Sequence, residues 1–374
     1  MSNAAGERNA AGSAMPPGTD PSGAVGGKLD DCGKSKTLRR GEILSRPTLA
    51  GEGGVAGNAA PTGAMAFGLA DAASVVPVAA RDANKYTRGK LVVAGGCAAY
   101  PAAPVMSALA AQRCGAGYVA LALPSGAAAA ARTHVLSITV SALPEVRGSF
   151  CAASVDGACE SLTKAAAFVV GPGMGRADEA GEFLSSFLAS EAACSCPGVL
   201  DADALFHIAH DRKAFLAARD GAAPLVLTPH YGEAARLLGD GHRVDEPAAC
   251  AVELARKWNN VVALKGPDTY IAAPDGRLRV VTVGGPELAH AGTGDVLAGV
   301  IGALLAQGVE SFDAACLGVY LHGKAGALAA AELGVSAVVP EDLPLCLARA
   351  IRSLEPLSTG LTAAQLDAER RATE

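Results

Sequence analysis

The sequence is poor in aromatic and charged residues, which make up only 4% and 18% of its 374 residues. It contains no run rich in lysine or arginine, and its formal net charge is −6. Because binding to a nucleic-acid backbone needs clustered positive charge, we expect no nucleic-acid partner. The ten cysteines include no C-x-x-C pair, and several stand in apolar runs. Reduced, buried thiols and a cytoplasmic setting are therefore expected.

Signals for export and membrane insertion are also missing. Residues 1–23 lack the apolar core of a secretory signal peptide. The uncharged stretch from Cys114 to Ala131 is interrupted by Pro124 and three glycines, which break a membrane-spanning helix. We therefore expect a soluble protein that does not insert into a membrane.

The composition changes along the chain. Residues 1–75 are dominated by Gly, Ala, Pro, Ser and Asn and show no sustained apolar periodicity, which predicts a low-complexity, disordered leader with at most a short helix near Ala64–Ala73. Residues 76–356 are expected to form one folded domain. Residues 357–374 form a polar C-terminal tail, either frayed or a short helix.

Within the domain, short β-branched runs alternate with helical stretches, which is typical of an α/β fold with a mostly parallel sheet covered on both faces. The expected strands are Leu91–Ala94, Tyr118–Leu123, Phe168–Val170, Val199–Leu200, Leu225–Leu227 and Val261–Leu264. An inserted β-hairpin is expected where Thr269–Ala273 and Leu278–Val283 flank a Pro-Asp-Gly-Arg turn. The expected closing helices are Asp295–Gln307, Ser311–Leu333 and Pro340–Leu354.

Glycines and ionisable residues follow these strands, in the segments Gly95-Gly96, Gly171–Gly175, Asp201–Asp203, Thr228–His230 and Lys265-Gly266. The carboxyl ends of parallel strands share one rim of a sheet, where ligands bind, so these segments are expected to meet there. The Gly171–Gly175 loop has neither Rossmann nor P-loop spacing. Asp201 and Asp203 fit either a hydrated Mg²⁺ or structural capping of strand ends. His207 and His210 have no third ligand nearby, and no protein metal site is expected.

The segment Gly292-Thr293-Gly294-Asp295 precedes an uncharged apolar stretch with helical spacing. Free N–H groups at a helix start bind anions, so this turn is expected to face an anion. Asp295 is expected to be ionised and directed at the same anion. Lys265, at a strand end, is expected to meet a phosphate group as a point charge.

Taken in order, several segments resemble the ADP- or ATP-dependent NAD(P)H-hydrate dehydratases, a family of the ribokinase-like superfamily. They are Val93–Gly96, Ala103–Val105, Gly115–Tyr118, Gly171–Gly175, Leu200–Ala204, Leu227–Glu233, Leu264–Gly266 and Ala291–Gly299. The resemblance covers about residues 85–354 and implies a ribokinase-like three-layer fold. It also implies a lyase that uses ADP or ATP with Mg²⁺ to phosphorylate the ring hydroxyl of hydrated NADH or NADPH, and then eliminates phosphate.

The resemblance further implies roles for individual residues. The hydrated dinucleotide would contact Ala103, Gly173, Gly175, His230 and Asp295, with Asp295 as the catalytic base. The phosphoryl donor would be held by Lys265, Gly266, Pro267, Asp268, Thr269, Gly292, Thr293 and Gly294. A homo-oligomer is expected, together with a separate NAD(P)H-hydrate epimerase acting on the same metabolite, because residues 1–75 are too short and irregular to be one.

The chain departs from the family pattern in three places. Asn84–Gly89 stands where the family often has His-Lys-Gly-Asp, Tyr231 replaces a proline, and Gly292-Thr293 replaces Gly-Ser. A vitamin-precursor kinase of the same superfamily would share Asp295 and the anion site, but the Gly171–Gly175 and Pro229–Glu233 segments favour the dehydratase. A non-catalytic nucleotide-binding module would gain nothing from a carboxylate directed at a transferred phosphate.

Overall fold

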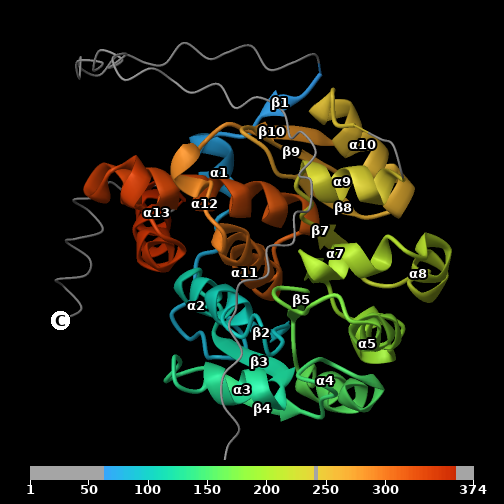
Figure 1. Ribbon diagram of the computed structural model, residues 1–374. Coiled ribbons are helices and arrows are strands. Elements are labelled where there is room, and N and C mark those ends of the chain that lie inside the picture. The colour runs from blue at the N-terminus through green and yellow to red at the C-terminus, as the bar shows by residue number, and fades with distance from the viewer. Residues whose placement is uncertain (1–62, 240–242, 359–374) are drawn as a thin grey trace, which may run out of the picture. The chain divides into compact units, whose positions relative to one another are not determined.

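The computed structural model describes residues 63–239 and 243–358. Its short strands pair into one sheet. In chain order the strands are β1 (Met65–Ala66), β2 (Lys90–Ala94), β3 (Tyr118–Pro124), β4 (Thr139–Leu143), β5 (Ala167–Val170), β6 (Gly198–Leu200), β7 (Leu225–Leu227), β8 (Val261–Leu264), β9 (Thr269–Ala272) and β10 (Leu278–Val281). They lie in the order β1-β10-β9-β8-β7-β6-β5-β2-β3-β4 (Figure 1). Strand β9 is antiparallel to β8 and β10, and the other neighbours are parallel.

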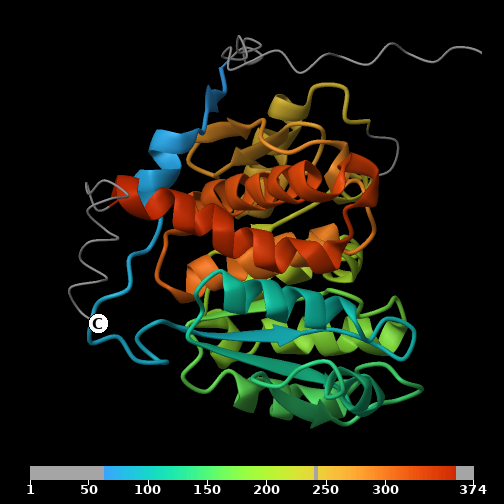
Figure 2. The same ribbon diagram turned by 90° about the vertical axis from the view of Figure 1, so that its left-hand side faces the viewer.

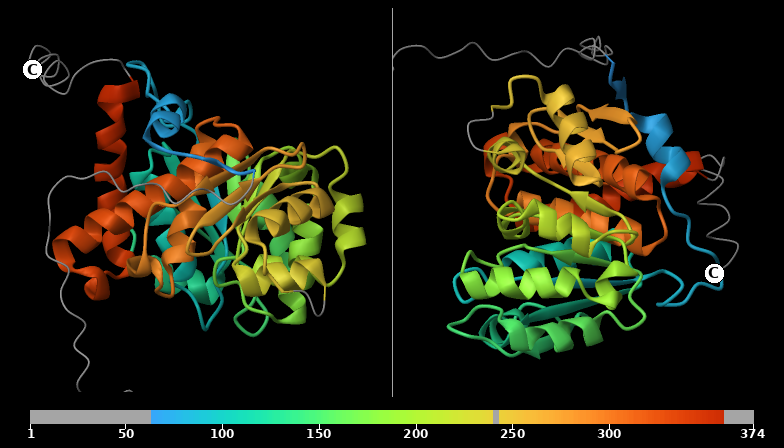
Figure 3. Two further views of the ribbon diagram at one scale, coloured as in Figure 1. Left: turned by 90° about the horizontal axis from the view of Figure 1, so that it is seen from above. Right: turned by 90° about the vertical axis from the view of Figure 1, so that its right-hand side faces the viewer.

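Helices cover both faces of this sheet. Figure 2 shows the face covered by α1 (Leu69–Val75), α2 (Ala103–Arg113), α3 (Ser125–Ala131), α11 (Thr293–Ala306), α12 (Ser311–Leu333) and α13 (Leu343–Ser358). The right-hand view of Figure 3 shows the face covered by α4 (Val155–Ser161), α5 (Asp178–Leu188), α6 (Glu191–Cys194), α7 (Asp203–Ile208), α8 (Arg212–Ala218), α9 (Tyr231–Leu238) and α10 (Pro247–Trp258). The helices and the sheet therefore form three layers.

The alternation of side chains along each strand explains the two cores. In β2, Leu91 and Val93 pack with the helices of the first face, whereas Val92 and Ala94 pack with those of the second. Successive side chains of a strand point to opposite faces, and here both faces are buried. The central strands are therefore apolar throughout, which is why they were recognisable in the sequence.

Helix α11 lies unusually close to its neighbours. A Cβ atom on Gly299 would lie 2.0 Å from the carbonyl oxygen of Ser107 in α2, so only glycine allows this approach. The Ser107 hydroxyl also donates a hydrogen bond to the carbonyl oxygen of Asp295, at 2.7 Å. These contacts fix the first turn of α11 at the carboxyl end of the parallel strands.

The predicted fold class, hairpin and central strands are confirmed. The boundary at residue 75 is wrong, because residues 63–75 belong to the folded unit. Strand β1 pairs with β10, and Phe67 and Ala72 are buried. Strand β4 was not predicted either. Most of the leader, residues 1–62, and residues 359–374 of the expected tail lie outside the described residues.

Candidate active site

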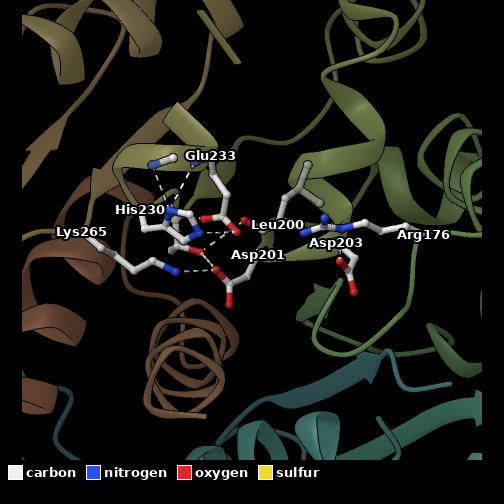
Figure 4. A network of polar contacts seen from close by, with 9 residues as sticks. Arg176, Leu200, Asp201, Asp203, His230, Glu233 and Lys265 are labelled. Carbon is white, nitrogen blue, oxygen red and sulfur yellow. Dashed lines mark hydrogen bonds and ion pairs between the residues drawn. The ribbon is translucent and has the colours of Figure 1, made fainter. Parts of the chain in front are cut away.

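A buried ion pair lies at the carboxyl ends of three neighbouring strands (Figure 4). Asp201 follows β6, Thr228 follows β7 and Lys265 follows β8. Asp201 Oδ1 accepts hydrogen bonds from Thr228 Oγ1 at 2.7 Å and from Lys265 Nζ at 2.9 Å. Burial alone would lower the pKa of Lys265, but the carboxylates of Asp201 and Glu233 outweigh it and raise that pKa. Lys265 is therefore a fixed positive charge, and Asp201, whose role the sequence left open, is its counter-ion.

The first turn of α11 offers free backbone donors. Gly292 caps the helix with a φ of 99°, and the N–H of Thr293 already donates to the carbonyl of His290, at 3.3 Å. The N–H groups of Gly292, Gly294 and Asp295 have no acceptor in the described part of the chain. The N–H of Thr293 therefore helps to hold the turn together. The neighbouring donors remain free to bind an anion.

Asp295 lies beside these donors and is less acidic than expected. Burial and the nearby carboxylate of Asp201 raise the pKa of Asp295 to about 7, against the opposing effect of Lys265. Asp295 is therefore only partly ionised at pH 7, whereas the sequence predicted an ionised carboxylate, because desolvation opposes the charge. A carboxylate with this pKa suits general base catalysis near neutral pH.

His230 caps α9, which explains its ring orientation. Its Nδ1 accepts from the N–H groups of Gly232, at 3.0 Å, and Glu233, at 3.3 Å. Burial and the charge of Lys265 lower the pKa of His230, so the ring is neutral at pH 7. With Nδ1 acting as an acceptor, the proton is on Nε2, on a side chain that is 60% exposed. Nε2 lies 3.5 Å from Oε1 of Glu233, and the exposure of the side chain leaves its N–H within reach of a ligand as well.

The Gly171–Gly175 loop, called the glycine loop below, reaches the same rim. Gly173 has a φ of 62°, and a Cβ there would lie 2.6 Å from the carbonyl oxygen of Tyr100 and 2.9 Å from the Cβ of Ala103. Ala103 and Gly173 are thus in contact, in agreement with their assignment to the same ligand, the hydrated dinucleotide. Asp203 holds the loop in place, since its carboxylate accepts from the N–H of Gly175 at 2.9 Å and from Arg176 at 3.1 Å.

A cavity of about 800 Å³ opens beside Lys265 and the start of α11. Six predicted donor-binding residues line it: Lys265, Gly266, Pro267, Thr269, Thr293 and Gly294. We call it the Lys265 cavity. Asp268 and Gly292 are not among its lining residues. His230, which the resemblance assigned to the hydrate, also lines it. The remaining wall is largely apolar and includes Leu288, Leu297, Val319 and one residue that the sequence gave no reason to select, His322.

Other cavities and clusters are less informative. A cavity of about 760 Å³ between α5, α7 and α8 contains none of the predicted site residues. Within residues 63–239 and 243–358, no three His, Cys, Asp or Glu side chains are grouped to hold a metal ion. Over the same ranges, no helix has the length and apolar character needed to cross a membrane. The nine described cysteines are free thiols.

The three-layer arrangement is that of the ribokinase-like fold. A ribokinase-like protein from Enterococcus faecalis superposes with a TM-score of 0.68 at 22% identity, over 80% of this chain and 99% of that one. The ADP/ATP-dependent NAD(P)H-hydrate dehydratase of Bacillus subtilis, co-crystallised with ATP/Mg²⁺, gives a TM-score of 0.66 at 24% identity, over 78% of this chain and 99% of that one. These likenesses define the fold class.

The sequence defines the family within that class. The family profile described as NAD(P)H-hydrate dehydratase matches residues 91–348. The ADP-dependent (S)-NAD(P)H-hydrate dehydratase of Neisseria meningitidis is 39% identical over 69% of this chain and 83% of its own length. The bifunctional NAD(P)H-hydrate repair enzyme of Moorella thermoacetica is 36% identical over 78% of this chain, which spans about half, 55%, of that relative. The chain belongs to the NAD(P)H-hydrate dehydratase family, and the resemblance drawn from its motifs is confirmed.

Proposed function

We propose that this protein dehydrates the S form of hydrated NADH and NADPH at the expense of ADP or ATP. The observation that carries the proposal is the position of Asp295. Its carboxyl group, with a pKa of about 7, lies beside free N–H groups of α11 and within the electrostatic reach of Lys265. A base, an anion site and a fixed positive charge together are what phosphoryl transfer to a hydroxyl group needs.

In the first step, the nucleotide occupies the Lys265 cavity with its phosphates toward Lys265 and the N–H groups of Gly294 and Asp295. The ring hydroxyl of the hydrate attacks the terminal phosphorus, and the bond from that phosphorus to its bridging oxygen breaks. Asp295 accepts the hydroxyl proton as the new P–O bond forms. The free N–H groups stabilise negative charge on the transferring group.

In the second step, the ring carbon loses its phosphate, which leaves with the C–O electron pair, while the neighbouring ring carbon loses a proton. The new double bond restores the reduced nicotinamide. We assign the hydrate to the side of the glycine loop, where Gly173 and Gly175 present backbone without side chains. His230 lines the Lys265 cavity, and we assign its neutral Nε2–H as a donor to the part of the hydrate that faces this cavity, while Gly175 contributes backbone.

Mg²⁺ fits this arrangement as a companion of the nucleotide, because such ions need only one or two protein carboxylates. Asp201 Oδ2 accepts no hydrogen bond from the described residues and lies 3.9 Å from the position of a Cβ on Gly294. When bound, Mg²⁺ supplies charge neutralisation on the phosphates. A homo-oligomer, a cytoplasmic location and a separate epimerase for the same metabolite remain predictions.

The proposal is tested by incubating the purified chain with hydrated NADH or NADPH, Mg²⁺ and either ADP or ATP. We expect the absorbance of reduced nicotinamide to return with release of one phosphate per molecule, and the Asp295→Asn variant to serve as the inactive control. Accumulation of a stable phosphorylated hydrate would instead indicate a kinase. Nucleotide binding without consumption of either substrate would indicate a binding module.

A further inference from the structure

One buried polar atom in the wall of the Lys265 cavity has no partner. His322, in α12, is only 8% exposed and lines the cavity. Its Nε2 is among the few buried side-chain atoms without a hydrogen-bond partner in the described residues. Buried polar atoms in folded proteins are nearly always paired, so an unpaired one in a cavity wall marks a place for a ligand atom.

The other ring nitrogen fixes what that ligand atom must be. The backbone carbonyl of Thr293 accepts a hydrogen bond from the ring, and burial lowers the pKa of His322 to about 4. The ring is therefore neutral at pH 7, and its single proton is on Nδ1. Nε2 then carries a lone pair and is an acceptor. Only a ligand group with an N–H or O–H can satisfy it.

The surroundings of His322 suit a nucleoside better than a phosphate. The cavity wall around it includes the apolar side chains of Leu297, one turn into α11, and Val319, one turn before His322 in α12. The positive charge of Lys265 and the free N–H of Gly294 belong to the phosphate end described above. A nucleotide with its phosphates there extends its apolar base and its ribose toward the remaining wall.

We propose that His322 selects the phosphoryl donor by accepting, at Nε2, a hydrogen bond from its adenosine part. This inference rests on the proposed function, because it takes the Lys265 cavity as the donor site. Two groups of adenosine have the required chemistry, the 6-amino group of the base and the ribose hydroxyls. A 6-oxo purine places an oxygen where adenine has its amino group, so it would set one acceptor against another.

The test compares ADP with three analogues in the parent chain and in His322→Asn, which keeps a donor for the Thr293 carbonyl but removes the Nε2 acceptor. Purine riboside diphosphate lacks only the amino group, and 2′-deoxy-ADP and 3′-deoxy-ADP each lack one hydroxyl. We expect His322→Asn to raise KM for ADP about tenfold to hundredfold, with little change in kcat or in KM for the hydrate. The analogue that lacks the bonded group should be a poor substrate for the parent and no worse for the variant.

Two further variants separate selection from a structural role. His322→Gln places an amide oxygen near the position of Nε2 and should recover part of the affinity for ADP. The same change from His to Asn at the exposed His134 is the matched control and should alter neither KM. Thermal unfolding of each variant checks that the fold is retained.

The inference is overturned if His322→Asn prefers ADP to each of the three analogues as strongly as the parent does. It is also overturned if the variant raises KM for the hydrate alone. Equilibrium binding of ADP and the analogues to the parent and to His322→Asn gives the same comparison without turnover. If the parent turns over no hydrate with any nucleotide, the proposed function fails. The binding comparison then still decides the role of His322.

Discussion

In the half of the site assigned to the phosphoryl donor, the ligand meets a cavity of about 800 Å³ whose wall is mostly apolar, with a few polar side chains that include Lys265, His230 and His322. In the half assigned to the hydrate, the ligand meets backbone, because Gly173 and Gly175 have no side chains and Asp203 supports their loop from behind. Asp295 lies between the two. The difference shows two ways of building selectivity, one by isolated polar atoms in an apolar wall and one by the shape of a loop.

Replacing Asp295, which lies between the two halves of the site, should slow the chemical step without changing the binding of either ligand. We expect Asp295→Asn to lower kcat by about 10²–10⁴, the range for loss of a general base, while both ligands still bind. Stopped-flow measurement of the return of reduced nicotinamide, with calorimetry for binding, checks this. Near-normal turnover would remove Asp295 from the chemistry and make Asp201 the next residue to test.

The same variant should be more stable than the parent. The pKa of Asp295 is about 7 in the folded chain, whereas an unfolded aspartate has a pKa of about 4. Between these pH values the folded state holds a proton that the unfolded state has lost, so the free energy of unfolding falls as pH rises. Asparagine does not ionise. The free energy of unfolding of Asp295→Asn should therefore exceed that of the parent at pH 8, by about 4 kcal/mol, as measured by denaturant titration.

A change confined to the hydrate half should leave the donor half intact. Gly173→Ala puts a Cβ 2.6 Å from a backbone oxygen at a φ of 62°, so the glycine loop must move. We expect kcat/KM for the hydrate to fall about 10- to 100-fold with KM for ADP unchanged. Gly308→Ala is the matched control, since its φ is 87° but no atom lies within 4 Å. Equal kinetic losses in both variants would attribute the effect to backbone strain alone.

A change confined to the donor half should do the reverse. Lys265→Met removes a phosphate contact and should raise KM for nucleotide about tenfold, more than KM for the hydrate. It also leaves the buried Asp201 without its counter-ion, which should cost about 3 kcal/mol of unfolding free energy. Adding Asp201→Asn should recover stability but not nucleotide affinity. If only the affinity for hydrate suffers, the assignment of the two halves is reversed.

The pH dependence of kcat should report the ionisation of Asp295. Asp295 must be unprotonated to accept a proton, so kcat should rise about tenfold per pH unit below a pKa of about 7 and level off above it. The pKa of His230 is lowered and that of Lys265 is raised, so neither should change charge near pH 7. Steady-state rates between pH 5.5 and 8.5 test this. A flat profile would contradict the assigned role of Asp295.

The smallest effect is expected from the N-terminal end. Deleting residues 1–62 removes no residue of the described site, so turnover should stay within about twofold of the parent. Deleting residues 1–75 also removes β1 and α1 with the buried Phe67, at a cost of about 2–3 kcal/mol for that side chain alone. Melting temperatures and turnover of both truncations check the contrast. If deletion of residues 1–62 abolished activity while the fold stayed intact, the leader would have a part in the site.

The sequence was most informative where a local pattern determines the structure. The apolar runs of β2, β5 and β8 are buried on both faces, and the glycine loop and the turn before Asp295 have their own signatures. It failed for β1, whose two residues find a partner only in the distant β10. It also failed for the pKa of Asp295 and for His322. Both depend on burial and on neighbours from other elements, which no spacing along the chain records.

The pairing of β1 with β10 has a consequence for synthesis on the ribosome. The Arg279 side chain bonds the carbonyl of Ala66 across 213 positions of the chain, and Phe67 packs against Tyr320 of α12. The first described strand and helix are therefore translated early but have no surface to pack on until α12 and α13 have emerged. During that interval the edge of β10 and the ring of Phe67 are open to other nascent chains. The slowest step in maturation is thus expected to be the docking of this N-terminal segment.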